Sequence, residues 1–166
     1  MSVSVISTGY RALTPLGALT LSATPEGATL DRRLRELYEK FEPHRAILAS
    51  LAQRINDLRT WGAGWEEYDA APPTPAAVDR AHQWIQDLYL DVLTSGRTWV
   101  DPLITASENG EAMFEWQRRE RRLTIRVTAT EVTCSKIGGT RPNFQFEDGT
   151  ADTSERRQSL WAWLGG

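Results

Sequence analysis

The clearest pattern along the chain is an alternation of polar and apolar residues over residues 122–129. The apolar positions fall on one face of an extended strand: Leu123, Ile125, Val127 and Ala129. The polar positions fall on the other face: Arg122, Thr124, Arg126 and Thr128. A period of two is typical of a strand that buries one face and leaves the other in water. With residues 111–117 before it, the segment predicts an antiparallel hairpin.

Other short segments nearby have the same strand-like character. They lie between turn residues at 103–106, 111–117 and 131–137, with a further short strand at 143–146 as an option. Because the connections are short, each strand is expected to pair with the next one in the chain. The second half of the chain therefore predicts a β-meander of about four strands.

The first half of the chain has helical periodicity instead. An apolar stripe with the spacing of an amphipathic helix consists of Leu30, Leu34, Leu37, Tyr38, Phe41, Leu48, Leu51, Ile55 and Leu58. Pro43 lies within the stripe, and a proline inside a helix removes a hydrogen bond and clashes with the preceding turn. One long helix or two shorter ones would fit, and we expect a break or kink near Glu42.

Two further helices have recognisable starts. Thr74 is expected to cap a helix that has Pro75 at its first position and runs to about residue 93. Asp152, with Glu155 three residues later, is expected to open a C-terminal helix. Their apolar stripes are Val78, Ala81, Ile85, Leu88 and Val92 in the first, and Leu160, Trp161 and Leu164 in the second.

These elements predict an α+β fold: an antiparallel β-meander of about four strands packed against two or three amphipathic helices, with a short C-terminal helix. A chain of 166 residues is long enough for one core without disulfides or metal. We expect an irregular N-terminal segment over residues 1–28 and a single domain over residues 29–166. That domain would comprise a helical half (29–94), a sheet half (100–147) and the C-terminal helix (152–164).

Composition narrows the class of protein. The net charge of -3 argues against a protein that coats nucleic acid, because such binding neutralises many phosphates with Lys and Arg. Cys134 is the only cysteine, which excludes an intrachain disulfide and fits a cytoplasmic location. No run approaches the roughly 20 apolar residues of a membrane span, and Pro15 interrupts the one segment that resembles a signal peptide.

No familiar catalytic arrangement is visible. His44 and His82 are the only imidazole bases, and neither lies in a recognisable motif, so we expect no catalytic residues. Two isolated histidines and one cysteine cannot form a structural zinc site, and we expect no metal and no cofactor. The acidic residues Glu66, Glu67 and Asp69 are interpreted as a solvated loop, with a hydrolase or nuclease site as an alternative.

The hairpin turn is rich in arginine. Together with Trp163, which is expected to lie off the stripe of the C-terminal helix, these arginines are the candidates for partner binding: Arg118, Arg119, Arg121, Arg122 and Arg126. Arginine beside an aromatic ring can grip phosphate or stack on a base, so nucleic-acid contact is an alternative to a protein partner. Arginines on a solvent-facing strand also keep a sheet edge from aggregating.

Two short segments carry a resemblance. The first is the loop from Gly64 to Pro73, which reads GWEEYDAAPP, and the second is Gly110 followed by Phe114-Glu115-Trp116. In this order and spacing they resemble a broad group of small, uncharacterised bacterial and phage proteins, although Glu67 and Asp69 stand where that group tends to have glycine. The resemblance implies no activity. The shared residues are interpreted as scaffold: Gly64, Trp65, Pro72, Pro73, Gly110, Phe114 and Trp116.

The expected function is that of a non-enzymatic interaction protein that docks on another protein or protein complex. An antitoxin, an immunity or anti-defence factor, or an accessory subunit would fit. Besides the lack of familiar catalytic chemistry, the expectation rests on 7 tryptophans and the arginine-rich turn, because Trp and Arg dominate binding energy at interfaces. The sequence leaves the oligomeric state open.

Overall fold

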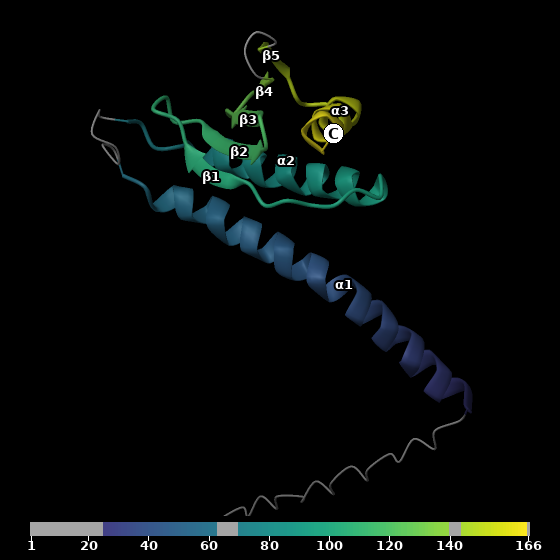
Figure 1. Ribbon diagram of the computed structural model, residues 1–166. Helices are drawn as coiled ribbons and strands as arrows, with labels where there is room; N and C mark the ends of the chain where they lie inside the picture. Colours follow the sequence, from purple (N-terminus) through teal and green to yellow (C-terminus); the bar gives the residue numbers. More distant parts are fainter. Residues whose placement is uncertain (1–24, 63–69, 140–143, 166) are drawn as a thin grey trace, which may run out of the picture. The chain divides into compact units, whose positions relative to one another are not determined.

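The structure is a computed structural model that describes residues 25–62, 70–139 and 144–165 (Figure 1). Its contacts divide the chain between Phe41 and Glu42 into two units. Helix α1 (Pro25–Asp57) contains residues of both units. The second unit also holds the remaining elements: the 3-10 turn η1 (Leu58–Thr60), helix α2 (Pro75–Thr94), strands β1 (Leu103–Ala106), β2 (Ala112–Arg118), β3 (Arg121–Val127), β4 (Val132–Gly138) and β5 (Gln145–Thr150), and helix α3 (Ser154–Gly165).

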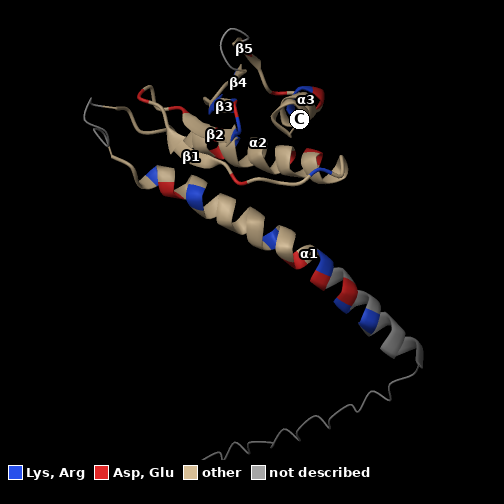
Figure 2. Ribbon diagram, viewed as in Figure 1, with Lys and Arg blue, Asp and Glu red and all other residues tan. Residues whose placement is uncertain are grey.

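Helix α1 is one continuous helix, so there is no break near Glu42. Pro43 removes one hydrogen bond to the carbonyl of Glu39, but both residues are exposed. Water can therefore reach the freed carbonyl. Figure 2 shows acidic and basic residues interspersed along part of α1, with an uncharged stretch between Arg45 and Arg54. The expectation of an irregular segment over residues 1–28 falls almost entirely on residues 1–24, which lie outside the described ranges, and α1 begins at Pro25.

The five strands form one antiparallel sheet in the order β1-β2-β3-β4-β5, so the predicted α+β class and meander are confirmed. The register places Phe114 of β2 opposite Ile125 of β3, and Ile125 opposite Cys134 of β4. All three side chains are buried. They belong to the inner face of the sheet, which packs against α2 and α3.

The core combines this inner face with the predicted stripes of α2 and α3 and with Leu51, Ile55 and Leu58 of the first stripe, whereas Phe41 of that stripe is 54% exposed. All the predicted apolar positions of α2 and α3 are buried, and Thr74 caps α2 as expected, since its side chain accepts a hydrogen bond from the Ala77 amide at 3.2 Å. The cap of α3 differs from the prediction. Thr153, not Asp152, accepts the hydrogen bond from the amide of Arg156. Asp152 instead forms an ion pair with Arg80 of α2 at 2.7 Å.

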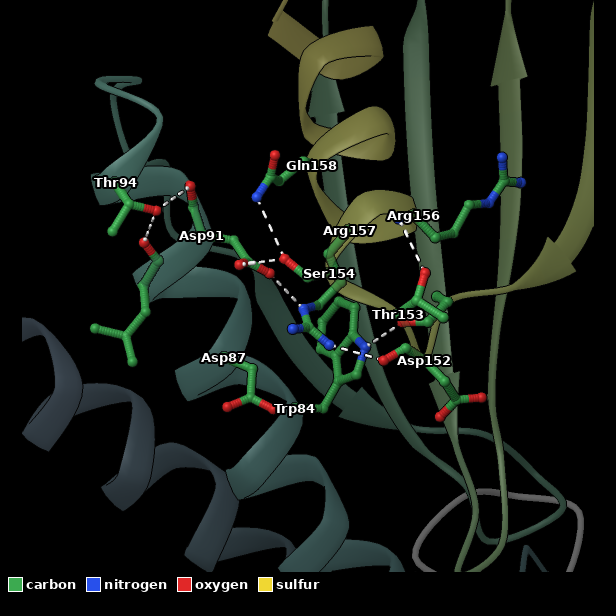
Figure 3. Close-up of polar contacts among 12 residues, drawn as sticks. Trp84, Asp87, Asp91, Thr94, Asp152, Thr153, Ser154, Arg156, Arg157 and Gln158 are labelled. Carbon is green, nitrogen blue, oxygen red and sulfur yellow. Dashed lines mark hydrogen bonds and ion pairs between the residues drawn. The ribbon is translucent and has the colours of Figure 1, made fainter.

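A buried polar cluster joins α2 to α3 (Figure 3). The Nε of Arg157 donates to the carboxylate of Asp91 at 2.7 Å, and the hydroxyl of Ser154 donates to the same carboxylate. Nη1 of Arg157 also donates to the carbonyl of Asp152, and the indole of Trp84 donates to the carbonyl of Ala151. This cluster fixes the start of α3 on α2.

Most of the described tryptophans are scaffold residues. Trp161 stacks on Trp99 with ring centroids 5.1 Å apart and meets Trp116 edge-on at 5.7 Å. The indole of Trp116 donates to the carbonyl of Val100 at 2.8 Å. Because these rings pack against one another in or beside the core, the tryptophan content mainly explains the core and gives little support to an interface. None of the helices in the described ranges is long and apolar enough to cross a bilayer.

Candidate binding groove

The outer face of the sheet carries rows of polar side chains at matched register. One row crosses four strands, because Glu115 of β2 lies opposite Thr124 of β3, Thr124 opposite Ser135 of β4, and Ser135 opposite Asp148 of β5. Side chains alternate along each strand, so this row points away from the buried Phe114 and Ile125. The outer face therefore places hydroxyl groups at its centre and a carboxylate on either side.

This face is hollowed into a groove of about 790 Å³. Thr124 is only 7% exposed and Ser135 only 9% exposed, although both lie on the outer face. The sequence predicted that Thr124 would be wet. It is buried because longer side chains on neighbouring positions rise around it. The residues that line the groove come from β2, β3, β4 and β5: Met113, Glu115, Arg122, Thr124, Arg126, Thr133, Cys134, Ser135, Ile137, Phe146, Asp148, Gly149 and Thr150.

Two arginines of the hairpin lie in this groove. Nη1 of Arg126 donates to the hydroxyl of Ser135 at 3.0 Å, so its guanidinium extends over the polar floor. Arg122 is more exposed, and its Nε lies 3.6 Å from the carboxylate of Glu115. The groove thus has both signs of charge beside hydroxyls.

The other three arginines are not in the groove. Arg121 donates to the carbonyl of Trp163 near the end of α3, and its guanidinium lies 5.5 Å from the centre of the Trp163 ring. A side chain added at Gly165 would come within 3.6 Å of Nη1 of Arg118, which places Arg118 at the same helix end. Arg119 is exposed in the turn, with a φ of 54°. The alternation of the strands therefore divides the candidate arginines between the two faces of the sheet.

Trp163, expected off the apolar stripe of α3, is partly buried. Lys136 lies 5.4 Å from the centre of its ring, so the ring contacts two cations, Arg121 and Lys136. Glu147 accepts hydrogen bonds from Lys136 and Arg156, and these bonds hold the pKa of Glu147 below its ordinary value. Trp163 thus joins α3 to β4 and to the hairpin, and this contact uses much of its surface.

Where they are described, the scaffold residues of the resemblance include two neighbouring pairs, Gly110 beside Pro72 and Phe114 beside Trp116. Gly110 has a φ of +76°, and a side chain there would come within 2.9 Å of the carbonyl oxygen of Pro72. The amide of Ala71 also donates to the carbonyl of Glu108. Phe114 and Trp116 are buried against Trp84, while Pro73 is buried in the loop before α2. Gly64 and Trp65 lie outside the described residues.

The histidines have structural partners. Nε2 of His82 is 2.9 Å from the amide oxygen of Asn56, and burial, aided by the charge of Arg59, lowers the pKa of His82. His44 is partly buried, with Nδ1 2.7 Å from the hydroxyl of Tyr89. Burial and the Asp101 carboxylate raise the pKa of Tyr89.

The described residues contain no group of three or more His, Cys, Asp or Glu placed to hold a metal ion. Cys134 is buried. The acidic residues Glu66, Glu67 and Asp69 lie outside the described ranges. Comparisons of the chain with protein-family models, with curated proteins and with solved structures give no match.

Sequence reasoning missed part of the groove. Arg122, Thr124 and Arg126 were placed on the outer face by their alternation. Ser135, Ile137, Phe146 and Asp148 join them only through the register of β4 and β5. Counting alternate residues outward from the turn would have assigned Arg118 and Arg121 to one face of the sheet and Arg122 and Arg126 to the other.

Proposed function

We propose that this protein is a non-enzymatic interaction protein that docks on another macromolecule through the groove on the outer face of its sheet. The groove itself is the observation that carries the proposal. Its lining combines a hydroxyl floor, both signs of charge, and the apolar side chains of Met113, Ile137 and Phe146. Protein interfaces likewise combine apolar side chains with polar groups that form hydrogen bonds.

A protein is the partner that we propose. Glu115 and Asp148 flank the floor of the groove, and their negative charges oppose a nucleic-acid backbone. An antitoxin, an immunity or anti-defence factor, or an accessory subunit of a larger complex would each use such a docking face. A cytoplasmic location belongs to the same proposal.

Capture of the partner with matched variants tests the proposal. Thr133 lies in the groove opposite Arg126, while Thr130 is exposed in the turn between β3 and β4. The Thr133→Trp variant fills the groove, and Thr130→Trp adds the same ring outside it. Tagged protein is crosslinked in the cells that encode it, and the captured partners are identified by mass spectrometry.

We expect wild type and Thr130→Trp to capture the same protein, and Thr133→Trp to lose it. Circular dichroism and thermal melting establish that both variants are folded. Retention of the partner by Thr133→Trp, or capture of no specific protein by the wild type, contradicts the proposal. Capture of a nucleic acid that survives protease and disappears with nuclease supports the alternative of nucleic-acid contact.

A further inference from the structure

Arg126 is a partly buried cation with a neutral partner. Its Nη1 donates to the hydroxyl of Ser135, whereas Arg122 on the same strand has the carboxylate of Glu115 nearby. Among the described residues, no carboxylate lies within ion-pair distance of Arg126. A guanidinium has five N–H donors, and a partly buried charge costs free energy unless it is paired. Arg126 therefore keeps donors available to an anion that enters the groove.

We infer that Arg126 anchors an acidic side chain of an extended protein segment that lies in the groove. The inference rests on the proposed function and names the chemistry of its partner. Arginine binds carboxylates through two parallel hydrogen bonds, which gives both strength and orientation. The hydroxyl of Ser135 holds the guanidinium over the floor, so less side-chain freedom is lost when the carboxylate binds.

The charges around Arg126 favour a polypeptide over a nucleic acid. Asp148 lies opposite Ser135, and Glu115 lies opposite Thr124, so a carboxylate stands on each side of the floor. A nucleic acid brings a negative charge with every nucleotide and meets both carboxylates. A protein segment can place a basic residue on each side of its acidic one and match the whole row.

Apolar side chains also line the groove. Met113 lies opposite Arg126 on β2, and Ile137 lies opposite Phe146 between β4 and β5. Phe146 is 59% exposed. In an extended segment every second side chain faces the sheet. The segment that we propose carries an acidic residue between two basic ones on the face toward the groove, with apolar residues on the same face.

A synthetic peptide with this order tests the inference by nuclear magnetic resonance. The probe is acetyl-Leu-Thr-Lys-Thr-Glu-Thr-Lys-Thr-Leu-amide, in which threonine favours the extended form and points away from the groove. It is titrated to millimolar concentration into the full-length ¹⁵N-labelled protein, so that weak binding is measured. A second peptide has Gln in place of Glu, and a thymidine hexanucleotide and inorganic phosphate serve as other anions.

The Glu peptide should cause saturable shifts of the Arg126 Nε–H and of the Thr124 and Ser135 amides. The Gln peptide should bind at least about tenfold more weakly, because it lacks the charge-assisted hydrogen bonds. Arg126→Gln should weaken the Glu peptide by a similar factor, and Arg126→Lys should restore part of the binding. Arg45→Gln, an exposed site on α1 outside the groove lining, should leave the affinity unchanged. The spectrum of each variant shows whether it is folded.

The inference is overturned if the Glu peptide gives no saturable shift, or if the Gln peptide or Arg126→Gln binds with equal affinity. Tighter binding of the hexanucleotide or phosphate at Arg126 overturns it in favour of a phosphate ligand. The partner-capture experiment distinguishes a failure of this inference from a failure of the proposed function. If Thr133→Trp loses the captured protein while the peptide fails, the docking function stands and only the anchor is wrong. If Thr133→Trp also keeps the protein, both are wrong.

Discussion

Replacement of Asp91 by alanine should strongly destabilise the protein. Asp91 and Arg157 form a buried ion pair, with side chains that are 15% and 10% exposed. The substitution leaves the guanidinium buried without its charged partner and removes the acceptor of the Ser154 hydroxyl. Breaking one partner of a buried pair costs about 3–5 kcal/mol, a large share of the 5–15 kcal/mol that stabilises a typical domain. Urea unfolding followed by tryptophan fluorescence measures this change in the free energy of unfolding.

Asp87 provides a matched control on the same helix. It accepts a hydrogen bond from Gln83 on the surface of α2, so Asp87→Ala should cost about 0.5 kcal/mol or less. Arg157→Met should also destabilise the protein, and the double variant Asp91→Ala/Arg157→Met should lose less than the sum of the two single changes. A cost below about 1 kcal/mol for Asp91→Ala, or strict additivity in the double variant, would refute the reasoning.

Other outcomes follow from the same structure. Gly110→Ala should lower the free energy of unfolding in urea by about 1–3 kcal/mol, because the left-handed backbone of Gly110 and the nearby carbonyl oxygen of Pro72 both oppose a side chain. Gly62→Ala, where a side chain would meet open space, should change the free energy of unfolding little. The pKa of His82 is lowered below its ordinary value of 6.5. The stability that neutral His82 contributes is therefore fully present above pH 6.5 and is lost as the pH falls through the folded-state pKa. The His82→Gln variant should flatten this part of the profile of stability against pH. A protein limited to residues 42–166 should melt within about 5 °C of the full chain, because every buried core side chain of the described residues lies at Leu51 or later. Failure of the 42–166 fragment to fold, or a profile of stability against pH that His82→Gln leaves unchanged, would contradict these expectations.

The sequence predicted the elements whose patterns are periodic. The alternation around Ile125 and the stripe around Ile85 each specify one buried face, and the structure has both. Strand β5 was harder to place, because its sequence QFEDGT contains the turn signal Asp-Gly and its side chains are mostly exposed. It is a strand because β4 supplies a hydrogen-bonding edge, which no local pattern reports.

The groove was only partly predictable for a related reason. Alternation tells which face Thr124 occupies, but it does not tell that the face is hollow. Burial of Thr124 depends on the side chains of β2 and β4 beside it, and these are brought together by register. Similarly, the pairing of Asp91 with Arg157 joins residues 66 positions apart, and no spacing rule connects them.

The sequential order of the strands also determines how the domain can assemble. Every strand pairs with its neighbour in the chain, so the sheet can grow outward from the hairpin of β2 and β3 with short loop closures, which favours fast folding. The inner face is different, because Trp161 and Leu164 of α3 complete its cover. During synthesis the sheet can therefore form early, while the part of its apolar inner face that α3 covers stays open to chaperones or to other nascent chains until α3 has emerged from the ribosome.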